Sequence, residues 1–114
     1  MEKENTVLCA ASAYDKKFYL SEDFDGLPGQ VKDELKIASV LFTEDVGGIL
    51  IMEFDEDGTL LLKTEADEGD LLYDEIGAAL KVRSLQREKK ELFEALEMYY
   101  KVFILGEDVQ ESEK

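Results

Sequence analysis

The chain has 114 residues, of which 28 are acidic and 13 basic, and it contains one cysteine and no histidine. The formal net charge of −15 repels phosphate backbones and anionic lipids, so nucleic acid and membrane surfaces are poor partners. The missing histidine excludes Ser-His-Asp and Cys-His nucleophiles, and the lone cysteine excludes cysteine-rich metal centres within one chain.

The length predicts one domain, residues 6–106, with short charged tails at residues 1–5 and 107–114 that we expect to be flexible. Cys9 lies in the apolar run VLCAASA, which favours a buried, reduced thiol. The first residues do not resemble a secretory signal, and no apolar stretch has the length of a membrane span. We therefore expect a cytoplasmic protein.

The first apolar runs, residues 7–13 and 18–20, flank a polar break and predict a hairpin. Beyond Pro28, apolar residues recur at helical spacing up to Gly47, which offers a left-handed stop. This pattern predicts a helix over residues 28–44, although residues 40–43 also suit a strand of a hairpin turning at Gly47-Gly48. The helical stripe comprises Val31, Leu35, Ile37, Ala38, Leu41 and Phe42.

The stretch EFDEDGTLLLKTE contains the acids and glycine of a calcium loop, but its spacing is wrong for one. With Gly58 at loop position 6, position 12 is Thr64, where an EF-hand needs a bidentate glutamate. A three-residue hairpin loop, residues 56–58, instead places the cleanest apolar set on one face. Its predicted pairs are Phe54 with Leu60, Met52 with Leu62, and Leu50 with Thr64.

Residues 65–75 contain six acids and no base, and the chain then has helical character until Gly106. Asp70 is the expected N-cap of a short amphipathic helix, and a second helix is expected to begin near Ser84. One long bent helix over residues 71–105 is the alternative. The apolar stripe of the first helix comprises Leu71, Leu72, Ile76, Ala79 and Leu80, and that of the last comprises Leu85, Leu92, Phe93, Leu96, Tyr99, Tyr100, Phe103 and Ile104.

The order of hairpin, helix, hairpin and helices predicts an α+β fold. We expect a two-layer sandwich in which an antiparallel sheet of about four strands, from two hairpins, carries the helices on one face. The short strands and the wide final stripe leave spare apolar area, which favours a homodimer.

The acidic segment is the one place where a metal site is chemically plausible. Asp67, Asp70, Asp74 and Glu75 are the candidate ligands, because carboxylates at i and i+4 repel unless a hard cation such as magnesium or calcium offsets them. Acids also gather at helix N-termini for electrostatic reasons alone, and this interpretation is preferred. We expect no catalytic residues and no cofactor.

The stretch KVRSLQREKK is the single basic segment, and it is a candidate for partner binding. Arg83, Arg87 and Lys90 share a helical face that could dock an anionic partner, or pair with nearby acids or a dimer mate. Tyr100 could line a ligand groove together with neighbouring aromatic residues. Aromatic residues on a helical stripe, however, are more often part of a core.

Five segments together carry a resemblance to a known family: VLCAASAYDKKFYL, LPGQVKDELKI, VLFTEDVGGI, DLLYDEIGAAL and LQREKKELFEALEMYYKV. The chain resembles a family of small bacterial proteins classed as a domain of unknown function, over nearly its whole length. The resemblance implies a bacterial cytosolic protein, and it brings no activity and no site residues.

The missing catalytic residue types, the acidity and the spare apolar surface favour a non-enzymatic protein-binding or adaptor protein. Secretion-type chaperones and toxin-neutralising immunity proteins are also small, acidic and α+β, by analogy at the level of fold only. The alternatives are a carboxylate metal-site protein and a small-molecule sensor with a pocket between the sheet and the final helix.

Overall fold

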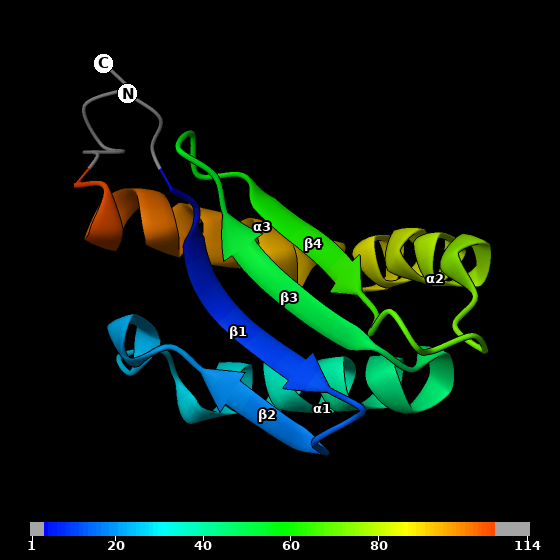
Figure 1. Ribbon diagram of the computed structural model, residues 1–114. Helices are drawn as coiled ribbons and strands as arrows, with labels where there is room; N and C mark the ends of the chain where they lie inside the picture. The colour runs from blue at the N-terminus through cyan, green and yellow to red at the C-terminus, as the bar shows by residue number, and fades with distance from the viewer. Residues whose placement is uncertain (1–3, 107–114) are drawn as a thin grey trace.

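Both predicted hairpins are present in a single antiparallel sheet (Figure 1). The structure is a computed structural model, and it describes residues 4–106. The strands are β1 (Thr6–Ser12), β2 (Lys17–Leu20), β3 (Ile49–Phe54) and β4 (Leu60–Glu65), in the spatial order β2-β1-β3-β4. The first and third strands lie side by side at the centre, so the two hairpins are joined through β1 and β3.

The hairpin of β3 and β4 has the predicted register, in which Phe54 pairs with Leu60 and Met52 with Leu62. One carboxylate oxygen of Asp55 accepts hydrogen bonds from the backbone N–H groups of Asp57 and Thr59, each at 2.9 Å. Gly58 has φ +87°, the left-handed conformation that closes such a turn. The acids of this stretch therefore build a turn, as the spacing indicated.

The first helix, α1 (Gly29–Val46), includes residues 40–43, so the strand alternative for them is wrong. It ends at Gly47, which has φ +86° and donates its N–H to the Thr43 carbonyl at 2.7 Å. A short 3₁₀ helix, η1 (Glu22–Phe24), precedes it and was not predicted. Ser21 caps this turn, and the turn buries Phe24.

The C-terminal third contains two α-helices, α2 (Glu75–Glu88) and α3 (Lys90–Tyr99), followed by a π-helical turn, η2 (Tyr100–Ile104). The break lies at Lys89 (φ −111°) rather than near Ser84. Asp74, not Asp70, caps α2, because its carboxylate accepts the N–H of Gly77 at 3.0 Å. The predicted cap was four residues too early.

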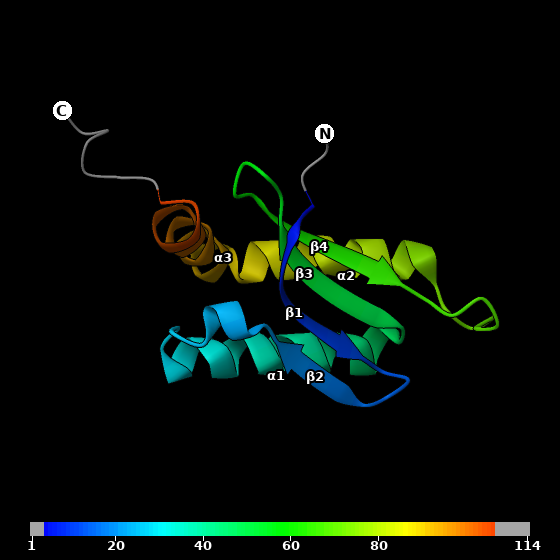
Figure 2. The ribbon, with the colours of Figure 1, turned by 60° about the vertical axis from the view of Figure 1, so that its left-hand side comes forward.

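The helices lie on one face of the sheet, with α1 behind β1 and β2, α3 behind β3 and β4, and α2 extending past the β4 edge, where it packs against α1 and α3 (Figures 1 and 2). The core between the layers contains the inward side chains of β3, namely Leu50, Met52 and Phe54, and Leu35 of α1, all fully buried. This arrangement confirms the predicted α+β class. Across residues 4–106, no helix combines the length and apolarity that a membrane crossing requires.

The predicted core stripe of α2 is the most exposed apolar surface of the described chain. Leu71 and Leu72 lie in the loop before α2, with 92% and 95% of their surface exposed, and Ile76 and Leu80 also face solvent. The helix instead packs through Ala78, Val82 and Leu85. The prediction of an inward stripe from Leu71 to Leu80 was therefore wrong, because the helix begins later and is rotated relative to the expected orientation.

The sheet face away from the helices carries an ion pair in which the Glu53 carboxylate is buried and the Lys63 side chain is half-exposed. Residues 1–3 of the predicted tail at 1–5, and the whole predicted tail at 107–114, lie outside the described residues. Asn5 of the expected N-terminal tail donates its side-chain amide to Glu53. Lys63 contacts the same carboxylate at 2.7 Å. Burial opposes ionisation of Glu53, but the hydrogen bonds from Lys63 and Asn5 outweigh it and lower the pKa of the carboxyl.

Replacing Glu53 with glutamine is expected to lower the free energy of unfolding by about 0.5–1 kcal/mol at pH 7, because the half-exposed Lys63 leaves the ion pair partly screened by water. A carboxyl whose folded pKa is depressed stabilises the protein above its unfolded pKa of about 4.5, and this stabilisation is lost as the pH falls through the lower folded pKa. Urea unfolding of wild type and Glu53→Gln should therefore show a stability difference at pH 7 that disappears in acid.

Glu56→Gln, in the exposed β3–β4 turn, is the matched control and should change the free energy of unfolding little. A stability difference for Glu53→Gln that persists unchanged into acid would contradict the role given to the ion pair.

Candidate functional site

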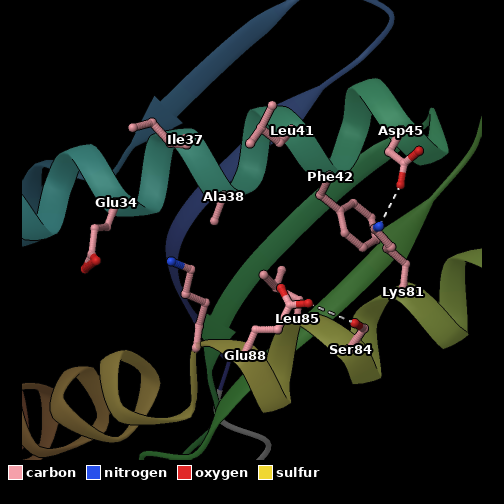
Figure 3. Close-up of a pocket in the computed structure, with 11 residues that line it drawn as sticks. Glu34, Ile37, Ala38, Leu41, Phe42, Asp45, Lys81, Ser84, Leu85 and Glu88 are labelled. Atoms are coloured by element: carbon pink, nitrogen blue, oxygen red, sulfur yellow. Dashed lines mark hydrogen bonds and ion pairs between the residues drawn. The ribbon is translucent and has the colours of Figure 1, made fainter.

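A groove of about 590 Å³ runs between α1 and α2 on the helical side of the molecule (Figure 3). Its floor is apolar and consists of Ala38 and Phe42 from α1 and Leu85 from α2. Ile37 and Leu41 form the lip on the α1 side, and each has 58% of its surface exposed. A surface with buried apolar residues below and exposed apolar residues beside them is suited to holding an apolar group.

The positions of these side chains follow from the helical repeat of α1. Leu35, Ala38 and Phe42 lie on the face that meets the sheet, whereas Leu41 falls about 100° away from Phe42 around the helix axis. One helix face cannot bury so wide a stripe. The sequence predicted that Ile37 and Leu41 widen the core stripe. An apolar stripe wider than one helix face can bury was the sequence signal for this groove.

Charged groups surround the groove. At one end the Lys81 ammonium contacts the Asp45 carboxylate at 2.8 Å, and this hydrogen-bonded pair links α2 to the end of α1. The Asp45 carboxylate raises the pKa of Lys81, so the ammonium stays charged at neutral pH. Along the α2 side, Ser84 donates its hydroxyl to Glu88 at 3.3 Å.

A second hollow continues the groove past the break between α2 and α3. Glu34, Glu88 and Lys89 line both hollows. The continuation adds Arg87 and Lys90, which are two of the residues predicted to bind a partner. The break at Lys89 thus places basic side chains at one end of an apolar groove.

Residues 5–108 match the model of a protein family that is described as a family of unknown function (DUF6145). The chain belongs to this family. The matched region contains every residue that lines the groove. No curated protein matches the chain, and no solved structure does so.

The four predicted metal ligands, Asp67, Asp70, Asp74 and Glu75, border one hollow between the end of β4 and the start of α2. Asp74 caps α2, and Asp70 accepts a hydrogen bond from the Tyr14 hydroxyl at 2.6 Å. Asp67 donates its backbone N–H to the same hydroxyl at 3.1 Å, and Glu75 lies exposed in the first turn of α2. Within residues 4–106, no three acidic, cysteine or histidine side chains come close enough to hold a metal ion.

The hydrogen bond to Asp70 raises the pKa of Tyr14, although the N–H of Asp67 partly opposes this effect. Tyr14 lies in the turn between β1 and β2, so its hydroxyl ties that turn to the loop before α2. The carboxylates of Asp70 and Asp74 therefore have local structural roles, in holding the loop that carries Leu71 and Leu72 and in capping α2.

Of the residues predicted for partner binding, three lie on the surface and one lies in the core. Arg83 and Arg87 are exposed on α2, and Lys90 begins α3. Tyr100 instead lies in the core, where its ring stacks on Phe54 at a centroid distance of 4.3 Å and its hydroxyl is 2.9 Å from the Thr6 hydroxyl. Tyr100 is therefore inaccessible to a partner in this structure.

The region between the sheet and the final helix is filled by aromatic rings. Phe24 stacks on Phe54 at 5.6 Å, and Tyr99 and Tyr100 each lie 6.3 Å from Phe24. Close packing of this kind lowers the expectation of a sensor pocket at the predicted place. The groove between α1 and α2 is a different location, open to solvent.

Cys9 lies in the core and not in the groove. Burial raises the pKa of its thiol to about 12, although a weak contact with the Ser39 hydroxyl at 4.0 Å slightly opposes this. A thiol with this pKa is almost entirely protonated at neutral pH and is a poor nucleophile.

Proposed function

We propose that this family member is a non-enzymatic protein-binding or adaptor protein of the bacterial cytoplasm, and that it holds a segment of a partner protein in the α1–α2 groove. The observation that carries the proposal is the exposure of Ile37 and Leu41 beside the apolar floor of Phe42 and Leu85. Removing apolar surface from water lowers the free energy. A partner segment that covers this lip is therefore bound more tightly.

The dimensions of the groove favour a short helical segment. From Glu34 to Asp45 the α1 wall extends about 16 Å, at 1.5 Å per residue, which is the length of about three helical turns. A segment with apolar side chains at helical spacing would place them over Ala38, Leu41 and Phe42, in the manner of other helix-in-groove complexes.

The charge of the molecule supports a partner segment with basic flanks. The net charge of −15 attracts a cationic segment at long range, and the carboxylates of Glu34 and Glu88 lie along the groove. Lys89, Arg87 and Lys90 repel a base at the far end, so the basic flank belongs at the end away from the α2–α3 break. The Asp45 carboxylate is already paired with Lys81, so it contributes less to an incoming base.

Photo-crosslinking in the native cell tests the proposal. A photoreactive phenylalanine derivative at position 37 should form an adduct with one discrete protein. The same residue at position 19 is the matched control, because Tyr19 lies on the sheet, away from the groove, and has 56% of its surface exposed against 58% for Ile37. We expect the adduct from position 37 and none from position 19.

Leu41→Asp places a charge in the apolar lip and should abolish the adduct from position 37, while circular dichroism shows the fold unchanged. Equal adducts from positions 19 and 37, or an adduct that survives Leu41→Asp, would contradict the groove. A saturable small-molecule ligand without any protein adduct would favour the sensor alternative, and calorimetric binding of magnesium, manganese or calcium that Asp70→Asn removes would favour the metal-site alternative.

A further inference from the structure

The outward face of α2 carries a second apolar surface, whose apolar residues lie outside the groove and whose basic end, Arg87, also borders the continuation of the groove. Ile76, Leu80, Arg83 and Arg87 fall within an arc of about 60°, at 100° per residue, and we call them the outer stripe. Ile76 and Leu80 have 76% and 62% of their surface exposed, and Leu72 precedes them in the loop. The outer stripe is therefore apolar in its first half and basic in its second half.

The charges at the two ends of α2 are arranged in mirror order. Going forward from Arg83, bases follow at intervals of four and three residues, at Arg87 and Lys90. Going backward in sequence from the cap Asp74, acids follow at the same two intervals, at positions 70 and 67 in the loop before α2, and these acids border one hollow together with Ile76. The pairs 83 with 74, 87 with 70, and 90 with 67 all have the same midpoint, between Ala78 and Ala79.

We infer that α2 packs antiparallel against α2 of a second copy of this chain, across a twofold axis near Ala78 and Ala79. Ile76 and Leu80 of both copies then lie at the centre, and the basic end of each helix faces the acidic end of the other. An isologous interface requires a surface that is complementary to itself, and the outer stripe together with the acidic loop before α2 has that property. Antiparallel helix dipoles also favour the arrangement.

Charge explains why the partner is a second copy and why contact occurs at this place. Residues 67–90 contain six acidic and five basic residues, whereas the other 90 residues contain 22 acidic and eight basic ones. Two copies therefore repel through most of their surface, and the segment around α2 is nearly neutral. An unrelated basic partner would gain from the acidic end of the stripe but would be repelled by Arg83 and Arg87.

The size of the interface predicts a weak dimer. A helix of 14 residues is about 21 Å long, and one such helix with its preceding loop covers less than the roughly 1,000 Å² of a stable interface. We expect a reversible dimer whose population rises with protein concentration. The groove stays open, because Lys81, Ser84 and Glu88 lie about 100° around α2 from the outer stripe.

Sedimentation velocity of the full chain, from about 10 µM to about 1 mM, should show a monomer that converts to a dimer. Leu80→Asp places a charge at the centre and should leave only monomer. Leu41→Asp is the matched control, since Leu41 has similar exposure but lies on the groove lip, and it should leave the dimer intact. Leu80→Asp should in turn leave the crosslink at position 37 intact, so the two proposals can fail separately.

Two charge-reversal variants test the mirror order directly. One carries Arg87→Glu with Lys90→Glu, and the other carries Asp67→Lys with Asp70→Lys. Each alone should be monomeric, because like charges then meet across the axis, whereas an equal mixture should form a heterodimer in which every pair is opposite in charge. Circular dichroism of each variant shows whether the fold is retained.

A wild-type chain that is monomeric over the whole concentration range would overturn the inference. So would a dimer that persists in Leu80→Asp, or a mixture of folded charge variants that fails to associate.

Discussion

Replacing Phe54 with alanine is expected to lower the free energy of unfolding by about 3–5 kcal/mol, the usual cost of removing a fully buried aromatic ring. Phe54 has no exposed surface, and its ring stacks on Tyr100 at 4.3 Å and on Phe24 at 5.6 Å. It thus joins the sheet, the 3₁₀ turn and the final helix. A domain of this size has a total stability of about 5–15 kcal/mol, so the variant should be close to unfolding.

Urea unfolding followed by circular dichroism measures this effect, since the chain has no tryptophan to report fluorescence. Phe103→Ala is the matched control, because the same atoms are removed from a ring that is mostly exposed and contacts Tyr99 at 4.8 Å. We expect the control to lose about 1 kcal/mol or less. Equal losses for the two variants would show that Phe54 does not have the central packing role assigned to it.

Replacing Gly48 with alanine is expected to cost about 2–4 kcal/mol, from backbone strain and a close contact together. Gly48 has φ +69°, where a side chain is strained. An added Cβ would lie 2.6 Å from the Glu65 carbonyl oxygen and 2.7 Å from the Tyr73 ring. The Glu65 oxygen is backbone of β4, so the strand end would have to move.

Gly47→Ala separates these two contributions. Gly47 has φ +86°, yet a Cβ there would meet nothing within 4 Å, so this variant should show the strain alone, about 1–2 kcal/mol. The larger loss for Gly48→Ala, measured by urea unfolding, reports the contact with Glu65 and Tyr73. A loss for Gly48→Ala no larger than that for Gly47→Ala would mean that the β4 end and the Tyr73 ring yield at no cost.

Local chemistry determined much of the fold from the sequence alone. The Asp55–Gly58 turn needs only a carboxylate that accepts nearby N–H groups and a glycine that adopts positive φ, and both requirements are met within five residues. The alternation of Leu50, Met52 and Phe54 then fixes the register of the hairpin, because a shift of one residue would turn all three to the other face. Gly47 ended α1 for a similarly local reason.

The candidate site depended on the tertiary structure. Helical periodicity shows which residues share a face, but it does not show whether that face meets the sheet or the solvent. In α2 two stripes compete, Ala78–Val82–Leu85 and Ile76–Leu80, and the position of α2 against the sheet decided between them. Likewise, neighbouring acids in sequence form a metal site only if their side chains point to one place, and here Asp74 and Asp70 bind different groups.

The sequence by itself therefore determined the α+β class, the hairpin register, the end of α1 and the absence of histidine chemistry, since each depends on residue identity or on contacts a few residues apart. Only the tertiary structure decided that Ile37 and Leu41 border a groove, that Leu80 faces outward and that Tyr100 is buried. These positions depend on how whole elements pack against one another, and a helix can rotate about its axis without any change in its local sequence pattern.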